Sequence, residues 1–172
     1  IEQRGLYDLA DAVSRTANMS QVYGPAGFSI RGIANIGVSG AGEAATATVY
    51  LDEAPLASTY LQAAPTRLWD VSQVEIWRGP QSTLRGLNSL AGAIIIKTAD
   101  PDINTWDMRA RAILTDENAR SLAVAGGGPV KTGELGFRLA AEVQSRDGFI
   151  RNITRMDGED EEESSMLRAK LL

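Results

Sequence analysis

Hydrophobic positions follow two different patterns along this chain, one before and one after Pro101. In the C-terminal part, apolar and polar residues alternate over 106–114, 135–144 and 167–171, and a weaker alternation surrounds Leu122 and Val124. Alternation places successive side chains on opposite faces, which predicts antiparallel strands with one apolar and one polar face. Each stretch has about the length of a strand that crosses a membrane, but a half-buried sheet in water shows the same pattern.

Two polar segments separate the alternating stretches. The run Gly126-Gly127-Gly128-Pro129 to Gly133 predicts a turn, because glycine and proline interrupt strands. The longer segment, 147–165, carries the acidic run 159–163 at its tip. A solvated loop is the ordinary interpretation of such a run, and attraction of cations is the alternative.

The N-terminal part contains shorter elements, beginning with a predicted helix over 5–15. Its apolar side is formed by Leu6, Leu9, Ala10 and Val13, and its polar side by Asp8, Asp11 and Arg15. A second short helix is predicted to open at Pro65 or Thr66 and to turn Leu68 and Val71 inward.

Strands are predicted over 28–33 and 45–51, the second followed by a turn at Asp52-Glu53. The glycine-rich segment 35–44 is predicted to be a loop. It contains a loose G-x-G-x-x-A pattern from Gly40, but a strand follows where a dinucleotide site needs a helix.

The most informative stretch runs from Val74 to Pro101. Strand composition over 74–78 is broken by Gly79-Pro80, and residues 82–85 are predicted to form one helical turn closed by Gly86. The apolar, branched run 93–96 predicts a strand buried on both faces.

This stretch resembles the plug domain of TonB-dependent outer-membrane receptors. The residues that match the family's pattern, in order, are Val74, Glu75, Arg78, Gly79, Pro80, Gln81, Thr83, Leu84, Gly86, Asn88, Gly92, Ile94, Ile96, Thr98 and Pro101. The chain departs from the pattern at Arg85, Ala91 and Ile95, where the family commonly has Tyr, Gly and Asn. Two further markers match, Ile30-Arg31-Gly32-Ile33 and the set Val49, Tyr50, Asp52 and Pro55.

The resemblance implies roles for a few residues. It implies that Arg31 and Arg78, with Glu75, hold the plug against barrel carboxylates on later strands. Gly32, Asp52, Gly79, Pro80, Gly86, Asn88 and Gly92 are implied to be motif residues of the plug fold. Asp52 is expected to accept backbone N–H bonds in its turn rather than to perform chemistry.

Composition excludes several classes of function. The 172 residues include no His and no Cys, which rules out a Ser-His-Asp triad, disulfides and thiolate metal sites, and no cofactor is expected. The net charge of −5 argues against nucleic acid as a partner. Neither half is charged enough to suggest an electrostatic class of ligand. An enzyme would need a carboxylate pair, and Asp52 and Glu53 are neighbours that point apart.

Together these observations predict an α+β fold: a plug domain over 1–100 with a small mixed sheet and short helices, followed over 101–172 by the first antiparallel strands of a truncated barrel. The resemblance implies energised uptake of a scarce ligand, such as a ferric siderophore, across the outer membrane of a Gram-negative cell. It also implies TonB and outer-membrane lipid as partners, with the TonB-binding segment expected to precede residue 1. The plug is expected in the barrel lumen, facing the periplasm.

Two alternatives remain at this point. The first is a soluble, β-rich binding module of the periplasm. The second concerns the strands after Pro101, which are too few to close a barrel and leave edges unpaired. They are expected to pack on the plug, or to pair or exchange with another copy of the chain.

Overall fold

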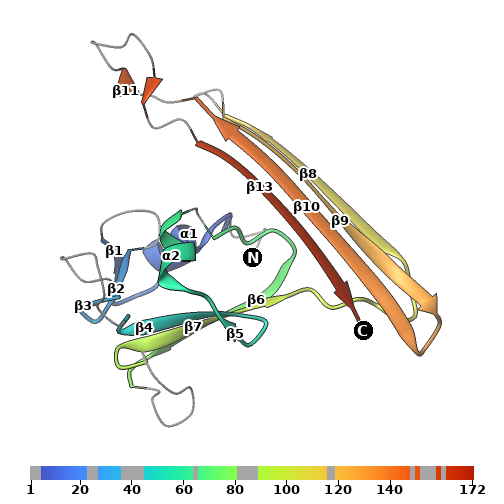
Figure 1. Cartoon of the computed structure of the whole chain (residues 1–172), viewed down its shortest axis with the longest axis horizontal. Coiled ribbons are helices and arrows are strands. Elements are labelled where there is room, and N and C mark those ends of the chain that lie inside the picture. The colour runs from blue at the N-terminus through green and yellow to red at the C-terminus, as the bar shows by residue number, and fades with distance from the viewer. Residues whose placement is uncertain are drawn as a thin grey trace. The chain divides into compact units, whose positions relative to one another are not determined.

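The computed structural model describes residues 5–22, 27–35, 45–63, 66–80, 89–115, 119–147, 150–151, 158–159 and 162–172. The chain divides into two units, Ile1–Ala99 and Asp100–Leu172 (Figure 1). Each unit is built around its own sheet, so they are described in turn.

Unit 1 centres on a four-stranded mixed sheet in the order β5-β4-β7-β6. The strands are β4 (Ala47–Leu51), β5 (Ala54–Pro55), β6 (Val71–Arg78) and β7 (Gly92–Thr98). The central strand β7 runs parallel to β4 and antiparallel to β6. Its residues from Ala93 to Ile96 are at most 1% exposed, which confirms the predicted strand buried on both faces.

The two faces of this sheet carry separate apolar clusters. On one face Val49, Ile94 and Ile96 form the main core, together with Leu9 and Val13 from the first helix. On the other face Ala93 and Ile95 pack with Tyr50 and Trp77. Residues of one parity along β6 and β7 therefore face the main core, and residues of the other parity face the aromatic cluster.

A second, three-stranded sheet consists of β1 (Met19–Gln21), β2 (Phe28–Ile30) and β3 (Ile33–Ala34). The single strand predicted over 28–33 is wrong, because Ile30 pairs with Ile33 across a two-residue hairpin turn. Arg31 and Gly32 form this turn with φ of 52° and 83°. Two successive positive φ values match the twist of a tight hairpin.

The helices of unit 1 are short. Helix α1 (Leu9–Ser14) is shorter than the predicted 5–15, because Asp8 caps it: its side chain accepts a hydrogen bond from the Asp11 N–H while the Asp11 side chain binds the Asp8 N–H. Burial raises the pKa of Asp8. Helix α2 (Ser58–Ala63) lies upstream of the helix predicted to open at Pro65 or Thr66.

That second helix is replaced by extended chain. Leu68 N–H donates to the Tyr7 carbonyl over 2.9 Å, and Arg67 bridges to Asp8 as an isolated antiparallel pair. Leu68 and Val71 are nonetheless buried, as predicted.

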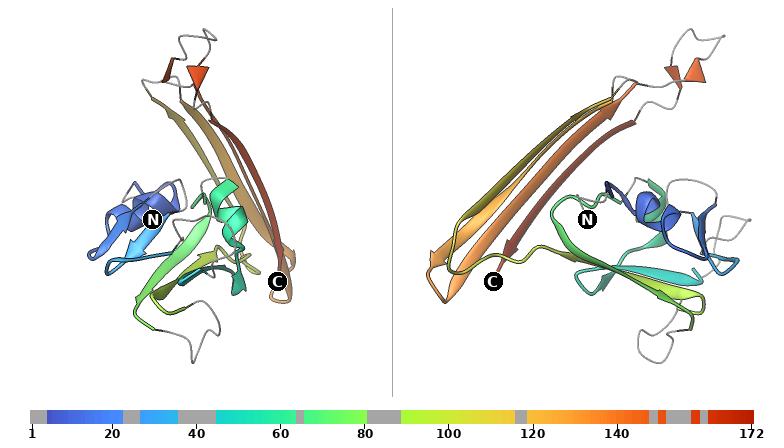
Figure 2. Two further views of the ribbon diagram at one scale, coloured as in Figure 1. Left: turned by 60° about the vertical axis from the view of Figure 1, so that its left-hand side comes forward. Right: turned by 180° about the vertical axis from the view of Figure 1, so that it is seen from behind.

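Unit 2 contains four long antiparallel strands in the order β13-β10-β9-β8. They are β8 (Asp107–Leu114), β9 (Arg120–Lys131), β10 (Leu135–Arg146) and β13 (Glu162–Leu171), and Figure 2 shows them side by side in one sheet. The short strands β11 (Ile150–Arg151) and β12 (Gly158–Glu159) pair with each other. The glycine run 126–128 lies inside β9, so the turn predicted there is wrong and is confined to 132–134.

The segment before β8 is folded onto the β9–β10 turn. Asp102 accepts hydrogen bonds from the N–H groups of Asn104 and Thr105 and from the Thr105 hydroxyl, and these bonds lower its pKa. The Gly133 N–H donates to the Ile103 carbonyl over 2.9 Å. The first strand of unit 2 therefore starts from a fixed position relative to its neighbours.

Candidate functional site

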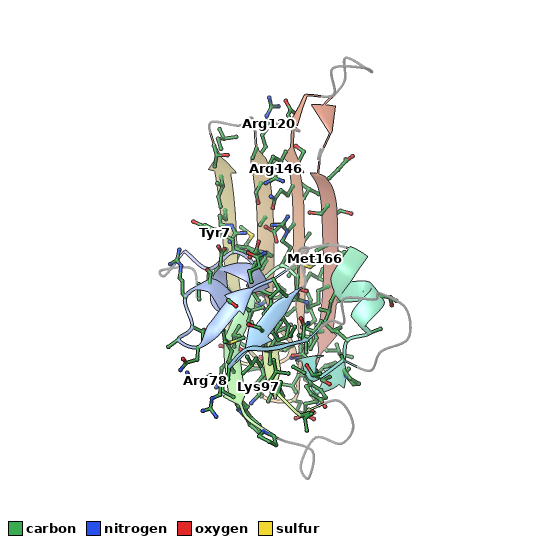
Figure 3. The ribbon with its side chains drawn as sticks, turned by 90° about the vertical axis from the view of Figure 1, so that its left-hand side faces the viewer. Tyr7, Arg78, Lys97, Arg120, Arg146 and Met166 are labelled. Carbon is green, nitrogen blue, oxygen red and sulfur yellow. The ribbon has the colours of Figure 1, made fainter. Side chains whose placement is uncertain are left out.

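The two arginines singled out by sequence lie at one corner of unit 1. Arg31 occupies the β2–β3 turn, and its backbone N–H donates to the Asn18 carbonyl over 2.8 Å. Arg78 ends β6, and its Nη1 donates to the Ala17 carbonyl over 2.8 Å (Figure 3). Two successive carbonyls of the segment between α1 and β1 therefore bind both arginines, one through its backbone and one through its side chain.

The guanidinium groups of this arginine corner are available to an external acceptor. The Arg31 Nη1 lies 3.9 Å from the position that a β-carbon would take on Gly79, the residue after Arg78. Both side chains are exposed. Within the part of the chain that the structure describes, no carboxylate forms an ion pair with either arginine.

Glu75 is not brought to this corner. Its carboxylate accepts hydrogen bonds from Trp77 Nε1 at 3.0 Å and Gln73 Nε2 at 2.8 Å, and lies 3.8 Å from Lys97 Nζ. These neighbours belong to the face with the aromatic cluster, whereas Arg78 has the parity of the residues that face the main core. The structure thus joins two of the three residues implied to hold the plug and separates the third.

Among the motif glycines, Gly92 has the strictest requirement. Its φ is 154°, and a β-carbon would lie 2.2 Å from the Trp77 carbonyl oxygen, so any side chain forces β6 and β7 apart. Gly79 continues the same pairing, since its N–H donates to the Ala91 carbonyl over 2.9 Å. Pro80 is exposed beyond the end of β6. The helical turn predicted over 82–86, with Gly86 and Asn88, lies outside the described residues.

Asp52 takes part in a longer-range contact than the sequence suggested. It forms the β4–β5 turn with Glu53, at φ of 45° and 71°. Its carboxylate accepts the backbone N–H and the hydroxyl of Thr98, at 2.8 and 2.6 Å. Thr98 matched the family pattern, but nothing in its local sequence pointed to this pairing.

The four long strands of unit 2 have an inverted distribution of polarity. One face, called the apolar face here, exposes large hydrophobic side chains: Trp106, Met108, Leu114, Leu122, Val124, Leu139, Val143, Leu167 and Leu171 are 50% to 85% exposed. The Trp106 ring packs edge-on to Phe137, with centroids 5.5 Å apart, and covers Gly128.

The opposite face, called the charged face here, buries ionic groups. Arg138 Nη1 lies 2.8 Å from Asp107 Oδ1, and Arg111 Nη2 lies 2.7 Å from Glu142 Oε1. Both pairs join β10 to β8 across β9, which contributes only Gly127, Ala125, Ala123 and Ser121 to this face. These small residues leave room for long side chains to bridge two strand spacings, roughly 10 Å.

No helix among the described residues is long and apolar enough to span a membrane. The same residues hold no group of three or more Asp or Glu side chains arranged to bind a metal ion.

Comparison with known proteins decides the family. A family model described as the TonB-dependent Receptor Plug Domain matches residues 1–93, more than half of the chain. The chain belongs to this family. The match covers nearly all of unit 1, including the arginine corner and Gly92, and it identifies a family of receptors rather than of enzymes.

Solved structures of receptors share the fold of both units. The ferric yersiniabactin uptake receptor FyuA from Yersinia pestis aligns over 99% of this chain and 27% of its own, at 22% identity and a TM-score of 0.83. FpvA from P. aeruginosa aligns over 99% of this chain and 21% of its own, at 16% identity and a TM-score of 0.77. The ferric-catecholate import receptor Fiu from E. coli K12 aligns over 89% of this chain and 21% of its own, at 18% identity and a TM-score of 0.68.

The plug domain therefore stands, and the predicted α+β fold with antiparallel strands after it is confirmed. The chain spans about a quarter of the length of FyuA.

Proposed function

We propose that this chain is part of a TonB-dependent outer-membrane receptor in which unit 1 gates energised uptake of a scarce solute. The observation that carries the proposal is the inverted sheet of unit 2, directly after a plug domain. A sheet that buries ion pairs and exposes its hydrophobic side chains suits a wall between lipid and an aqueous lumen.

The same sheet argues against a soluble periplasmic module. Exposed apolar area costs about 25 cal/mol per Å² in water, and patches beyond a few hundred Å² are rare on soluble monomers. The apolar face carries large side chains on all four long strands. Lipid chains remove this cost, and so do other barrel strands or a second copy at the open edges.

Unit 1 would close the lumen from inside, with the boundary between plug and barrel near residue 100. Arg31 and Arg78 present two guanidinium groups at one corner, and in the proposed receptor carboxylates on later strands pair with them. A desolvated ion pair gains about as much free energy as it costs, so it holds a specific closed position with little net adhesion. A plug that must rearrange when TonB pulls needs such a contact.

The solute is proposed from the likeness to other receptors. The titles of three similar structures name ferric yersiniabactin, pyoverdine and a ferric catecholate. All three are names of siderophore systems. A ferric siderophore or a comparable chelate is therefore the proposed cargo, and the proposed location is the outer membrane of a Gram-negative cell.

An uptake assay tests the proposal. The full-length receptor, expressed in a Gram-negative strain that lacks its own siderophore receptors, should fractionate with the outer membrane and support uptake of at least one iron-55 siderophore. Deletion of TonB in the same strain should abolish that uptake. Recovery of the protein as a soluble periplasmic species, or uptake that is equal with and without TonB, would contradict the proposal.

A further inference from the structure

The charged face of unit 2 is organised in rows that run across the sheet. Paired residues of adjacent strands share a face, so the registers define which side chains line up. From the β9–β10 turn outward, the rows are Asp107–Gly127–Arg138–Lys170, Arg109–Ala125–Ala140–Arg168, Arg111–Ala123–Glu142–Met166 and Ile113–Ser121–Gln144–Ser164.

The first and third rows balance their charges. The first contains the Arg138–Asp107 pair, and its Lys170 lies 2.7 Å from Asp100. The third contains the Arg111–Glu142 pair. Arg138 and Glu142 are each 4% exposed, so both pairs are fixed parts of the sheet.

The second row differs from its neighbours, and we call it the arginine row. It places Arg109 on β8 and Arg168 on β13, with no carboxylate at any of its four positions. Between them lie Ala125 and Ala140, both 2% exposed, which form a flat floor. The row thus adds two positive charges between two neutral ion pairs.

This arrangement was hidden by total charge. Residues 101–172 carry 13 acidic and 10 basic side chains, but many of the acidic ones lie in 147–163. Resolved by face and row, the centre of the charged face is cationic. Charges on a surface with low-dielectric walls attract ions of opposite sign and raise their local concentration.

We propose that the arginine row binds an anionic solute with several carboxylate or comparable oxyanion groups. Guanidinium binds such groups through two parallel hydrogen bonds, which gives both strength and orientation. The α-carbons of Arg109 and Arg168 lie three strand spacings apart, about 14 Å, which suits a solute with more than one acidic group. The proposal rests on the proposed function, because the charged face lines a lumen only in a closed barrel.

A binding experiment on the purified full-length receptor tests this, with citrate as the tricarboxylate probe. Titration calorimetry in non-ionic detergent at low salt should detect citrate binding to the wild type. The Arg109→Gln/Arg168→Gln variant should bind citrate at least about tenfold more weakly, since each charge-assisted hydrogen bond contributes roughly 1.5–3 kcal/mol. The Arg109→Lys/Arg168→Lys variant keeps the charges but not the paired geometry, and should fall between the two.

The control removes the same charge elsewhere in the sheet. Arg120→Gln/Lys131→Gln changes two exposed positions of β9 and should leave citrate affinity within about twofold of the wild type. A shift in gel mobility on heating confirms that each variant is a folded barrel.

Equal citrate affinity in the wild type and the Arg109→Gln/Arg168→Gln variant would overturn the proposal, as would the absence of citrate binding to the folded wild type. Because TonB takes no part in this measurement, its failure leaves the uptake assay to judge the proposed function separately.

Discussion

The carboxylate of Asp52 accepts both polar hydrogens of Thr98, from the backbone N–H at 2.8 Å and from the hydroxyl at 2.6 Å. Asp52 follows β4, and Thr98 ends β7, which runs parallel to β4. The Asp52 N–H in turn donates to the Ile96 carbonyl over 2.9 Å. The β4–β5 turn therefore holds the end of the central strand just before the chain leaves unit 1.

We predict that Asp52→Ala loosens the end of β7. Thr98 is 2% exposed, and each of its two donors left without an acceptor costs about 1–3 kcal/mol. Asp52→Asn should cost less, since it keeps one acceptor oxygen and tolerates the positive φ. Hydrogen exchange over 92–98 in the full-length receptor measures this. Exchange in Asp52→Ala as slow as in the wild type would contradict the role of the contact.

The pattern of the sequence predicted the strands well because their causes are local. Alternation over 106–114 and 135–144, and the branched run 93–96, correspond to β8, β10 and β7. The hairpin at Arg31 escaped because a non-glycine residue in the left-handed region is unusual, and it depends on the Asn18 carbonyl from a distant turn.

Other errors have equally specific reasons. Glu75 and Arg78 are three residues apart on a strand, so parity alone places them on opposite faces, and the family resemblance concealed this. Helix α1 was overextended because Asp8 was assigned to the polar face rather than to the cap, although Asp8 and Asp11 have capping-box spacing. The Asp52–Thr98 contact spans 46 residues, and no local pattern reports such a distance.

Gly92→Ala should prevent proper pairing of β6 and β7. The added β-carbon would lie 2.2 Å from a backbone oxygen that cannot move without breaking the sheet, and we expect a loss above about 3 kcal/mol in stability of unit 1. Gly32→Ala is the matched control, since its φ is 83° but no atom lies within 4 Å, and it should cost only about 1–2 kcal/mol. Protease resistance of unit 1 in the full-length receptor compares the two. Equal resistance would show that space at Gly92 is not limiting.

Arg31→Ala and Arg78→Ala should each raise leak through the receptor or lower uptake, without preventing insertion into the membrane. Each change removes one guanidinium from the arginine corner and with it a proposed contact to the barrel. Leak is measured by entry of vancomycin, a molecule too large for general porins, and uptake with an iron-55 siderophore. Lys97→Ala, which removes an exposed cation beside Glu75 on the other face, should change neither. Unchanged leak and uptake in both arginine variants would count against the holding role.

Glu142→Gln should destabilise the strands of unit 2. The side chains of Arg111 and Glu142 are 14% and 4% exposed, and removal of one partner from a buried ion pair costs about 3–5 kcal/mol. The double variant Arg111→Met/Glu142→Met should recover part of this loss, because it leaves no buried charge. Urea unfolding in detergent gives both values, with Lys131→Gln of the exposed Lys131–Glu134 pair as a control near zero. A double variant less stable than either single variant would refute this interpretation.

Asp8 should make helix α1 more stable as pH falls. Burial raises the pKa of its carboxyl above the ordinary value of 3.8, so the folded state binds the proton more tightly than the unfolded state. The stabilisation is complete below the unfolded pKa and is lost as pH rises through the folded pKa. Asp8→Asn keeps the oxygen that accepts the Asp11 N–H at 2.8 Å but does not ionise.

Protection of residues 9–15 from hydrogen exchange, compared between variants at each pH, measures this difference. Relative to wild type, Asp8→Asn should gain protection as pH rises from about 3.5 to 6.5, because only the wild type then carries a desolvated charge. Asp8→Ala, which loses the cap, should lack about 1 kcal/mol of protection relative to Asp8→Asn at every pH. If the wild type and Asp8→Asn keep the same ratio of protection across this range, the charge on Asp8 has no effect on the helix.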